Sequence, residues 1–488
     1  MVSTQIILYN QLRKEYLHED SKSFLYIHHI WKIMFQWEEL ILNTGSKIID
    51  YAWWRNFINE LLSDWKQANF VISKSFFTWL KDYAKKNSVS QFSIVKPVEN
   101  YVYNNFLKIQ RQLQNIWITL EFIEDTQSFY LSHEDFLKQY SKPPIMEYFY
   151  RFMRKKENIM ISDNGSPEGW NWNYDDMNRK FDRKHERTWD FYLQTNPWLI
   201  EAQDYYNYQL QFPQPTSRKE ALLLLDYFVT DHLDTFWKLE DAMYQNDPYV
   251  HHSMLSSCIN YWFLSPKEVV KRVEKSDTAI NNKEWFIRQI LGWREYMFHF
   301  FQFYKNTIYK QNFFNHTHKL PDYFWKDWNH TSMNCLSTTL QQVQSENISH
   351  HIQRLMIIGN FSLLTHLNPH ELNKWFFEYY IDAFEWVVTP NVLAMSQYAD
   401  GWNLATKPYI ASANYINKMS NYCKNCQYNP KEKTTDSACP FNYLYWNFVD
   451  ENKEVFQKWR QHFVLKNLER IDIQKLRELK KKFISKKI

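Results

Sequence analysis

Four cysteines of this chain are spaced so that they could hold an inorganic centre: Cys335, Cys423, Cys426 and Cys439. Cys423 and Cys426 form a CxxC pair in a polar stretch, whereas unligated thiols prefer buried apolar surroundings. Four thiolates suit either a tetrahedral zinc ion or a 4Fe-4S cluster, and the spacing does not choose between them. A proline follows Cys439, as it follows the last ligand of some iron–sulfur runs, which favours iron slightly. We expect the ligand set to tie a helical domain to its own C-terminal loop. The fifth cysteine, Cys258, is expected to be buried and unligated.

A second candidate site lies in the segment SENISHHIQRLMIIGNFSLL, which predicts one amphipathic helix with His350, His351 and Arg354. The sequence becomes apolar directly after Arg354, so its guanidinium should be buried and should need a carboxylate, for which Asp400 is a candidate. A histidine beside such a pair could act as a general acid, because its pKa lies near neutrality. The alternative is a histidine that makes only structural hydrogen bonds.

The composition excludes several classes of protein. Glycine supplies 6 of 488 residues, where roughly 7% is usual. Their positions form neither a GxGxxG fingerprint nor a phosphate loop, which excludes standard dinucleotide-binding and P-loop enzymes. Aromatic residues (19%) and charged residues (23%) predict a globular chain with large cores. The net charge is +4 and basic residues gather in 466–488, so any nucleic-acid surface would be a local patch. We interpret the lysine run as a solvated helix end, with a binding arm as the alternative.

The chain has no apolar run long enough to span a membrane, and its first residues lack the pattern of a cleaved signal peptide. Five cysteines are too few for a disulfide scaffold. We therefore expect a cytoplasmic protein with no membrane partner.

The pattern of apolar residues predicts two structural regions. In the first, strands are expected at 4–8, 47–51, 69–72 and 116–121, with helices near 29–42 and 53–67, which indicates a parallel sheet. From residue 216 helical segments dominate, beginning with PTSRKE as a capped start and continuing at 267–274, 283–310, 337–364, 369–386 and 450–482. The predicted organisation is an α/β domain (1–130), an inter-domain linker and loop (131–214) and an all-helical domain (215–488).

The chain resembles the iron–sulfur bacterial cryptochromes and photolyases, also called prokaryotic (6-4) photolyases, over nearly its whole length. The resemblance is carried by MEYFYRFMRKKENIMISDNGSPEGWNWNYDDMNRK (146–180), PTSRKEALLLLDYF (215–228), HHSMLSSCIN (251–260), WFIRQILGWREYM (285–297), HHIQRLMIIGNFSLL (350–364) and the run 385–448. It implies the cryptochrome/photolyase fold, in which a Rossmann-like antenna domain precedes an all-helical FAD-binding domain.

The resemblance also implies roles for individual residues. Cys335, Cys423, Cys426 and Cys439 match the family's four ligands of a 4Fe-4S cluster, so iron replaces zinc as our interpretation. The implied FAD contacts are Ser253, Ser256, Gln289, Arg294, Glu295, Arg354 and Asp400. His351 matches the histidine next to the lesion, and Tyr409 and Tyr415 match tyrosines of the lesion pocket. Trp375 matches the flavin-proximal electron donor, and we expect Trp325, rather than Trp328, to be the next tryptophan outward.

The implied function is light-driven repair of (6-4) pyrimidine photoproducts in UV-damaged DNA, with an electron from excited reduced FAD and a proton from His351. Two alternatives are a blue-light photoreceptor of cryptochrome type on the same scaffold and a zinc-stapled nucleic-acid-binding protein without enzymatic activity. Further expectations are a monomer of the bacterial cytoplasm, a 6,7-dimethyl-8-ribityllumazine antenna and a Mg²⁺ ion at Asp175 or Asp176.

The chain departs from the family at positions where glycine is usual and a larger residue stands here: Trp237, Trp262, Trp285, Trp402, Lys424 and Asn425. A tryptophan at such a position must fill space that glycine would leave for close backbone approach.

Overall fold

A five-stranded parallel sheet forms the N-terminal part of the computed structural model, which describes residues 2–8, 11–13, 23–27, 44–63, 67–71, 76–174, 181–185, 189–191, 193, 196–210, 214–405 and 408–487. The strands are β1 (Val2–Leu8), β2 (Ser23–Ile27), β3 (Gln67–Val71), β4 (Val89–Val95) and β5 (Thr119–Ile123), in the order β3-β2-β1-β4-β5. Every pairing is parallel, and Ile6 lies opposite Leu25 on one side and Ile94 on the other. Ile6, Phe92 and Ile94 are fully buried, as expected for a sheet covered by helices.

The strand predictions are partly confirmed. The segments 4–8, 69–72 and 116–121 coincide with or overlap β1, β3 and β5, whereas β2 and β4 were not predicted. The prediction of a strand at 47–51 was wrong, because these residues lie in helix α2 (Thr44–Ser63). A short apolar run does not distinguish a strand from a helix, and here Ile48, Ile49, Ala52 and Trp53 form a buried helical face. The predicted helix at 29–42 lies outside the described residues.

Helices make up most of the remaining structure. Their bounds are α3 (Phe76–Asn87), α4 (Asn100–Gln114), α5 (His133–Gln139), α6 (Met146–Glu157), η2 (Glu168–Trp170), α7 (Pro197–Tyr206), α8 (Arg218–Tyr227), η4 (Phe228–His232), α9 (Leu233–Leu239), α10 (Ser256–Asn260), α11 (Pro266–Glu274), α12 (Ile280–Ile287), η5 (Arg288–Arg294), α13 (Glu295–Tyr304), η6 (Ile308–Lys310), α14 (Asp322–Trp325), η7 (Trp328–His330), α15 (Asn334–Glu346), α16 (His351–Gln353), η8 (Arg354–Gly359), α17 (Asn360–Leu364), α18 (Pro369–Tyr379), α19 (Glu385–Thr389), η9 (Pro390–Ser396), α20 (Ala413–Met419), η10 (Tyr422–Asn425), α21 (Pro440–Glu451), α22 (Lys453–Lys458), α23 (His462–Leu468) and α24 (Ile473–Lys487). The predicted cap is confirmed, since the Ser217 side chain accepts a hydrogen bond from the Glu220 N–H at the start of α8.

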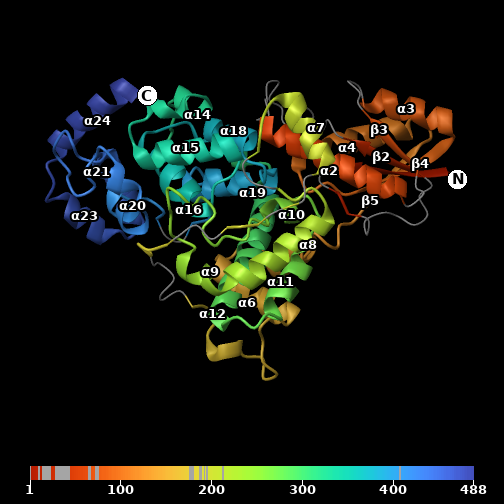
Figure 1. The fold of residues 1–488 in the computed structure, drawn as a ribbon, viewed down its shortest axis with the longest axis horizontal. Coiled ribbons are helices and arrows are strands. Elements are labelled where there is room, and N and C mark those ends of the chain that lie inside the picture. The colour runs from red at the N-terminus through yellow and green to blue at the C-terminus, as the bar shows by residue number, and fades with distance from the viewer. Residues whose placement is uncertain are drawn as a thin grey trace.

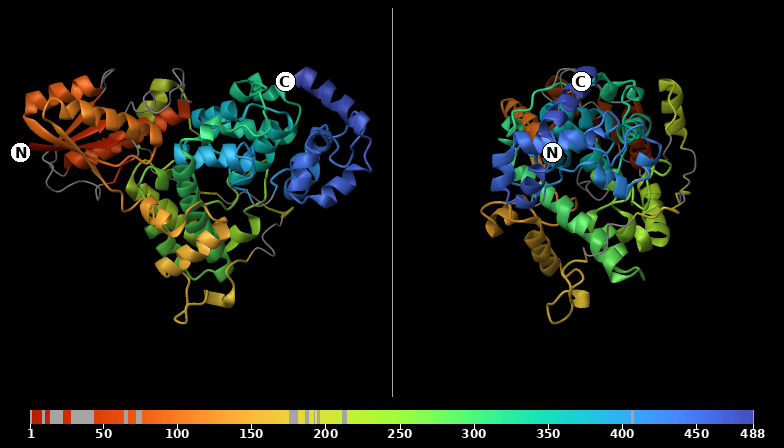
Figure 2. Two further views of the ribbon diagram at one scale, coloured as in Figure 1. Left: turned by 180° about the vertical axis from the view of Figure 1, so that it is seen from behind. Right: turned by 90° about the vertical axis from the view of Figure 1, so that its left-hand side faces the viewer.

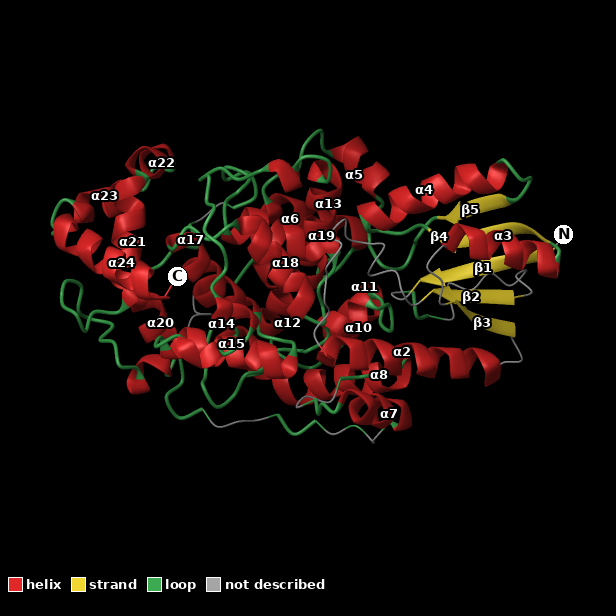
Figure 3. Ribbon diagram, turned by 90° about the horizontal axis from the view of Figure 1, so that it is seen from above, coloured by secondary structure: helices red, strands yellow, loops and turns green. Residues whose placement is uncertain are grey.

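The sheet lies at one end of the elongated molecule and helices α21 to α24 lie at the other (Figure 1). Figures 2 and 3 show the same order from behind and from above, with the other helices between the two ends. Among the described residues, no helix is both long enough and apolar enough to cross a membrane.

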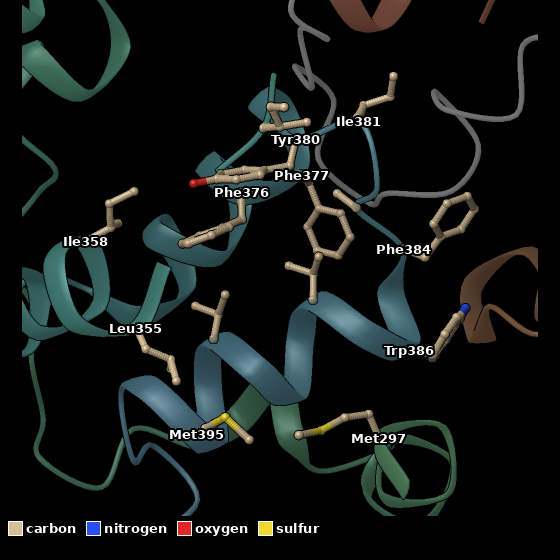
Figure 4. Packing of buried hydrophobic residues seen from close by; sticks show 14 of the residues in the cluster. Met297, Leu355, Ile358, Phe376, Phe377, Tyr380, Ile381, Phe384, Trp386 and Met395 are labelled. Atoms are coloured by element: carbon tan, nitrogen blue, oxygen red, sulfur yellow. The ribbon is translucent and has the colours of Figure 1, made fainter. Parts of the chain in front are cut away.

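One continuous apolar core joins the sheet region to the helices. Trp53 of α2 is 1% exposed, packs against Tyr261 with ring centroids 3.6 Å apart, and donates from Nε1 to the Pro215 carbonyl at 2.6 Å. Deeper in the helical part, the rings of Phe376 and Tyr380 stack at 4.7 Å, as Figure 4 shows among the neighbouring apolar side chains. This packing holds the helix ends that carry the candidate sites.

Candidate functional site

Four cysteine side chains line one cavity near the C-terminal helices. Cys335 lies in the first turn of α15, Cys423 and Cys426 lie in and just after η10, and Cys439 is the N-cap of α21. The remaining lining is mostly apolar and aromatic, from Met333, Ala413, Ile416, Tyr422, Tyr428 and Phe441. Backbone hydrogen bonds from Asn429 N to Ser437 O and from Cys439 N to Asn429 O fold the loop between Cys426 and Cys439 back on itself. The structure thus brings together all four cysteines that the sequence grouped.

The thiols of this cavity are strongly desolvated. Burial raises the pKa of Cys439 to about 12 and that of Cys423 to about 11, and neighbouring cysteines add to both effects. Burial and the three other cysteines hold the pKa of Cys335 well above its usual range. A polynuclear cation at the centre would supply the positive charge that four adjacent thiolates need.

Two further observations concern the cysteines. Among the described residues, no group of three or more His, Cys, Asp and Glu side chains is arranged to hold a metal ion. The four thiols line one shared cavity. Cys258 lies outside this lining, is 1% exposed in α10, and has a pKa raised to about 12 by burial, as expected for an unligated core thiol.

The second site is centred on Arg354, where the short α16 continues into the π-helical turn η8. Arg354 pairs with Asp382, whose two carboxylate oxygens lie 3.1 and 3.0 Å from Nη2. The Arg354 Nε donates to the Ser349 carbonyl at 2.8 Å, and the guanidinium lies 4.2 Å from the centre of the Tyr380 ring. π-Helical turns are frequent at functional sites, because they shift side chains out of the regular helical row.

The prediction that Asp400 pairs with Arg354 was wrong. The Asp400 carboxylate closes its own turn by accepting hydrogen bonds from Trp402 N at 3.0 Å and Leu404 N at 2.9 Å. Burial raises the pKa of Asp400 to about 6. An aspartate in a tight turn often accepts hydrogen bonds from backbone N–H groups a few residues ahead. At Asp400 these local hydrogen bonds form in place of the predicted ion pair with Arg354.

Three histidines gather beside the Arg354–Asp382 pair. The rings of His252 and His350 stack with centroids 4.6 Å apart. His350 is 7% exposed, and neither of its ring nitrogens has a hydrogen-bond partner among the described residues. Buried polar atoms are nearly always satisfied, so these nitrogens fit a site that is completed by a polar ligand. We call His252, His350, His351, Arg354 and Asp382 the His–Arg cluster.

His351 is the exposed first residue of α16. Its side chain is solvent-accessible, yet the surrounding protein lowers its pKa to about 4, mainly through desolvation and then through the positive charge of Arg354. At neutral pH, in the protein without ligands, the imidazole is therefore uncharged.

The predicted serines lie on a segment that reaches the His–Arg cluster. Ser256 is the exposed first residue of α10, and Ser253 is half-buried, with its side chain 3.4 Å from Leu255 N. Asn260, at the other end of α10, donates from Nδ2 to the Asp382 carbonyl at 3.2 Å. This hydrogen bond links the helix that follows the serine segment to the backbone of Asp382.

The other predicted cofactor residues are held elsewhere. Arg294 donates to the Ser128 carbonyl at 2.8 Å and lies between the rings of Phe129 and Trp386, 4.8 Å from each centre. Glu295 accepts from Leu131 N at 2.9 Å. Gln289 is half-buried and bonds to the Trp285 carbonyl one turn earlier at 3.0 Å. For Arg294 and Glu295 these contacts fasten the helix to segment 128–131.

The two predicted lesion-pocket tyrosines are both half-buried. Tyr409 donates its backbone N–H to the Tyr398 hydroxyl, and Tyr415 lies in α20. The side chain of Asn360 binds both backbone groups of Ala411, at 2.8 and 3.2 Å. Because Asn360 directly follows η8, this bond ties the tyrosine segment to the helix of Arg354.

Trp375 is fully buried in α18 and donates from Nε1 to the Phe324 carbonyl at 2.7 Å. Its ring stacks on Tyr379 at 5.3 Å and 27°, and Tyr379 in turn lies 6.3 Å from half-buried Trp325. Trp325 is thus joined to Trp375 through a residue that the sequence argument did not name. Asp175 and Asp176, the predicted cation ligands, lie outside the described residues.

Sequence reasoning missed His252, Asp382, Tyr380 and Tyr379. Two of them had a visible signal: His252 precedes the serine segment, and Asp382 is the acidic residue of the short turn between α18 and α19. The sequence pattern does not show that the turn of Asp382 faces Arg354, because the two residues lie at the ends of different helices.

Comparison with known proteins places the chain. A family model described as deoxyribodipyrimidine photo-lyase-related protein matches residues 55–198. A (6-4) photolyase of Agrobacterium fabrum is 40% identical over 349 residues, which cover 68% of this chain and 68% of that protein. A bacterial class III photolyase structure from Agrobacterium tumefaciens matches with a TM-score of 0.61 at 13% identity, over 96% of this chain and 98% of the other.

A cryptochrome structure from Synechocystis matches with a TM-score of 0.60 at 14% identity, over 86% of each chain. These two structures show that the fold is that of photolyases and cryptochromes, a parallel sheet followed by a mostly helical region. With the (6-4) photolyase matched over two thirds of its length, the chain belongs to the family of deoxyribodipyrimidine photolyase-related proteins.

Proposed function

We propose that the protein repairs (6-4) pyrimidine photoproducts in UV-damaged DNA with light. The observation that carries the proposal is the His–Arg cluster, in which the exposed His351 adjoins the partly buried Arg354–Asp382 pair and the two unsatisfied ring nitrogens of His350. Membership of a family that includes a protein named as a (6-4) photolyase supports it.

The residues that would hold FAD are Ser253 and Ser256 on the phosphate side and Arg354 with Asp382 on the ring side. The orphaned nitrogens of His350 are suitable donors or acceptors for the same group. When bound, reduced FAD supplies the light-driven electron. Gln289, Arg294, Glu295 and Asp400 remain predicted contacts, which the family resemblance alone supports.

His351 would hold and deliver the proton at its imidazole ring. Desolvation and Arg354 keep it neutral in the free protein, with a pKa of about 4. A negative charge arriving beside His351, such as a DNA phosphate or a lesion that gains an electron, would favour the protonated ring. Proton gain would then coincide with substrate binding, which suits a donor that acts only on a bound lesion.

Tyr409 and Tyr415 would contact the flipped pyrimidine pair. Duplex stacking hides the damaged bases, so repair requires that they be extruded into a pocket, where aromatic side chains can stack on them. The Asn360 bonds to Ala411 hold this segment next to η8, which favours a fixed pocket wall.

We also propose that Cys335, Cys423, Cys426 and Cys439 bind a 4Fe-4S cluster. Each thiolate of such a cluster binds a different iron, and four cysteines around one shared cavity suit this arrangement. The cluster would fasten α15 and α21 to the C-terminal loop. The ribityllumazine antenna, a Mg²⁺ ion at Asp175 or Asp176, a monomeric state and a cytoplasmic location stay predictions.

The test is illumination of purified protein, with reduced FAD, in the presence of an oligonucleotide that contains one (6-4) photoproduct. We expect restored pyrimidines in the light and none in the dark. His351→Ala should lose repair while FAD binding persists, and His330→Ala, which changes an exposed histidine outside the cluster, should retain it. Bound FAD without any repair by the unaltered protein would contradict the proposal and favour a photoreceptor.

A further inference from the structure

A row of aromatic rings leads from Trp375 toward the surface. The Tyr379 ring stacks on Trp375 with centroids 5.3 Å apart and an interplanar angle of 27°. The same ring lies 6.3 Å from that of Trp325, and the Tyr379 hydroxyl donates to the Trp325 carbonyl. Trp375 is fully buried, whereas Tyr379 and Trp325 are half-buried. The row thus connects the protein interior with a residue that solvent can reach.

We propose that Tyr379 is the electron relay between Trp325 and Trp375, an inference that rests on the proposed function. Electron tunnelling weakens steeply with distance, so two tryptophans exchange electrons rapidly when an aromatic ring bridges them. The Tyr379 ring is that bridge. Its hydroxyl bond to the Trp325 backbone fixes the ring in place.

The adjacent Tyr380 does not serve this role. Its ring meets Trp375 edge-on, at 5.8 Å and 78°, and the Arg354 guanidinium lies over it at 4.2 Å. A positive charge over an aromatic face makes loss of an electron from that ring less favourable. The Tyr380 hydroxyl bonds to Ser349 at 2.8 Å, so this residue leads back into the His–Arg cluster.

Each step of the proposed relay moves one electron. In the proposed function, bound FAD would supply a light-excited electron acceptor, and loss of one electron to it would leave the Trp375 indole oxidised. One electron then passes from Trp325 through the Tyr379 ring to Trp375, so that Trp375 is restored and Trp325 becomes the oxidised residue. A thiol in the solvent returns one electron to Trp325 and is itself oxidised. No bond within the protein forms or breaks.

The relay is tested by following the tryptophan radical after a light flash. Tyr379→Leu removes the ring and should abolish the fast decay of the Trp375 radical, whereas Tyr379→Phe keeps the ring and should retain it. The matched control is Tyr323→Leu, a buried tyrosine beside Phe324 and outside the row. Thermal unfolding of each variant shows whether the fold is intact.

A second readout does not need the flavin. Dissolved ruthenium tris(bipyridine) with a persulfate quencher oxidises accessible aromatic residues of the flavin-free protein, Trp325 among them, and the proposal requires that the oxidation reach buried Trp375 through the Tyr379 ring. We expect a Trp375 radical in the unaltered chain and in Tyr379→Phe, but none in Tyr379→Leu. Equal radical yields in all of these proteins would overturn the relay. A protein that binds no flavin yet shows this dependence on Tyr379 would overturn the proposed function instead.

Among the residues that the structure describes, four tryptophans have the left-handed backbone conformation that glycine adopts readily: Trp117 (φ 62°), Trp170 (φ 66°), Trp262 (φ 66°) and Trp402 (φ 78°). For a bulky residue this conformation is a genuine outlier. Trp117 is 94% exposed and Trp170 is 80% exposed, so packing does not impose it there. The chain also has 22 tryptophans and only 6 glycines.

We infer that these four positions are glycine in the protein as its own cell makes it. The triplet UGA encodes tryptophan in some bacterial codes and glycine in others, so one reassigned codon would account for both the excess of tryptophan and the lack of glycine. Tryptophans with ordinary backbone angles and full burial, such as Trp375, would have the codon UGG.

The codons decide this inference. UGA at the four positions, with peptide masses from the native source that match glycine, is the expected result, and UGG at these positions would overturn it. A physical test uses the exposed turn at Trp117. Trp117→Gly should raise the thermal unfolding midpoint, whereas Trp117→Ala, which keeps a Cβ at positive φ, should raise it less. Equal midpoints for the two variants would remove the structural basis of the inference.

Discussion

Replacing Asp382 tests the identity of the carboxylate that neutralises Arg354. The Asp382 side chain is 9% exposed and that of Arg354 is 22% exposed. Removal of one partner from a buried pair costs about 3–5 kcal/mol, and the partly exposed arginine places Asp382→Asn near the lower end, at about 3 kcal/mol. Asp400→Asn keeps one oxygen for the two N–H groups of its turn and should cost about 1 kcal/mol.

These free energies translate into different melting temperatures. At about 2.1 cal/mol/K per residue, unfolding 488 residues has an entropy of about 1 kcal/mol/K. Asp382→Asn should therefore lower Tm by about 3 °C and Asp400→Asn by about 1 °C. The assay is far-UV circular dichroism of flavin-free protein, so that altered cofactor binding does not contribute.

A double-mutant cycle separates the pair from other effects. Arg354→Gln combined with Asp382→Asn should cost less than the sum of the two single changes, because the partners lose their charges together. Additive costs, or a larger effect of Asp400→Asn than of Asp382→Asn, would refute the assignment of Asp382 as the partner.

Three further predictions concern other parts of the chain. Cys335→Ser should reduce the iron content and the broad visible absorption of anaerobically purified protein, while Cys258→Ser should leave both unchanged, since Cys258 lies outside the cysteine cavity. Burial lowers the pKa of His232 to about 4 and that of His251 to about 3. In the unfolded chain both pKa values lie near 6.5, so below this pH the unfolded chain binds more protons than the folded protein. Urea titrations should therefore show the free energy of unfolding falling by up to about 1.4 kcal/mol per pH unit for each histidine as the pH drops from about 6.5 to 4. Trp53→Ala should destabilise the joint between α2 and the helical region by about 3–5 kcal/mol in equilibrium unfolding, whereas Trp53→Phe should cost less.

The sequence predicted those features that depend on local pattern or on a shared chemical requirement. The four cysteines line one cavity, as predicted. This prediction needed only the residue type and the shared chemical requirement of a ligand set, and it did not depend on the path of the chain between Cys335 and Cys423. Strand β1 follows from a run of apolar and β-branched residues with clear bounds. The capped start of α8 follows from Ser217 and Glu220.

The errors came from competition that a linear pattern does not display. The apolar pattern of residues 47–51 is compatible with a strand and with a helix, because five positions are too few to distinguish the two periods. The burial of Trp53 extends the apolar face with helical spacing, as in α2. The sequence made Asp400 a plausible partner of Arg354, but both carboxylate oxygens of Asp400 accept hydrogen bonds from backbone N–H groups of its own turn. Tyr379 was overlooked because an aromatic residue one turn after Trp375 on an amphipathic helix looks like ordinary core.

The charges of the His–Arg cluster link substrate binding to protonation. Arg354 and Asp382 neutralise one another, and His351 is uncharged at neutral pH because its pKa is about 4. The cluster therefore carries little net charge before a ligand arrives. A phosphodiester bound beside His351 would raise its pKa, and at any pH between the free and bound values binding would take up a proton. Since the same proton is the one that repair would need, affinity for damaged DNA should weaken as the pH rises above the bound-state pKa. Lesion recognition and the supply of the proton would then be one event at His351.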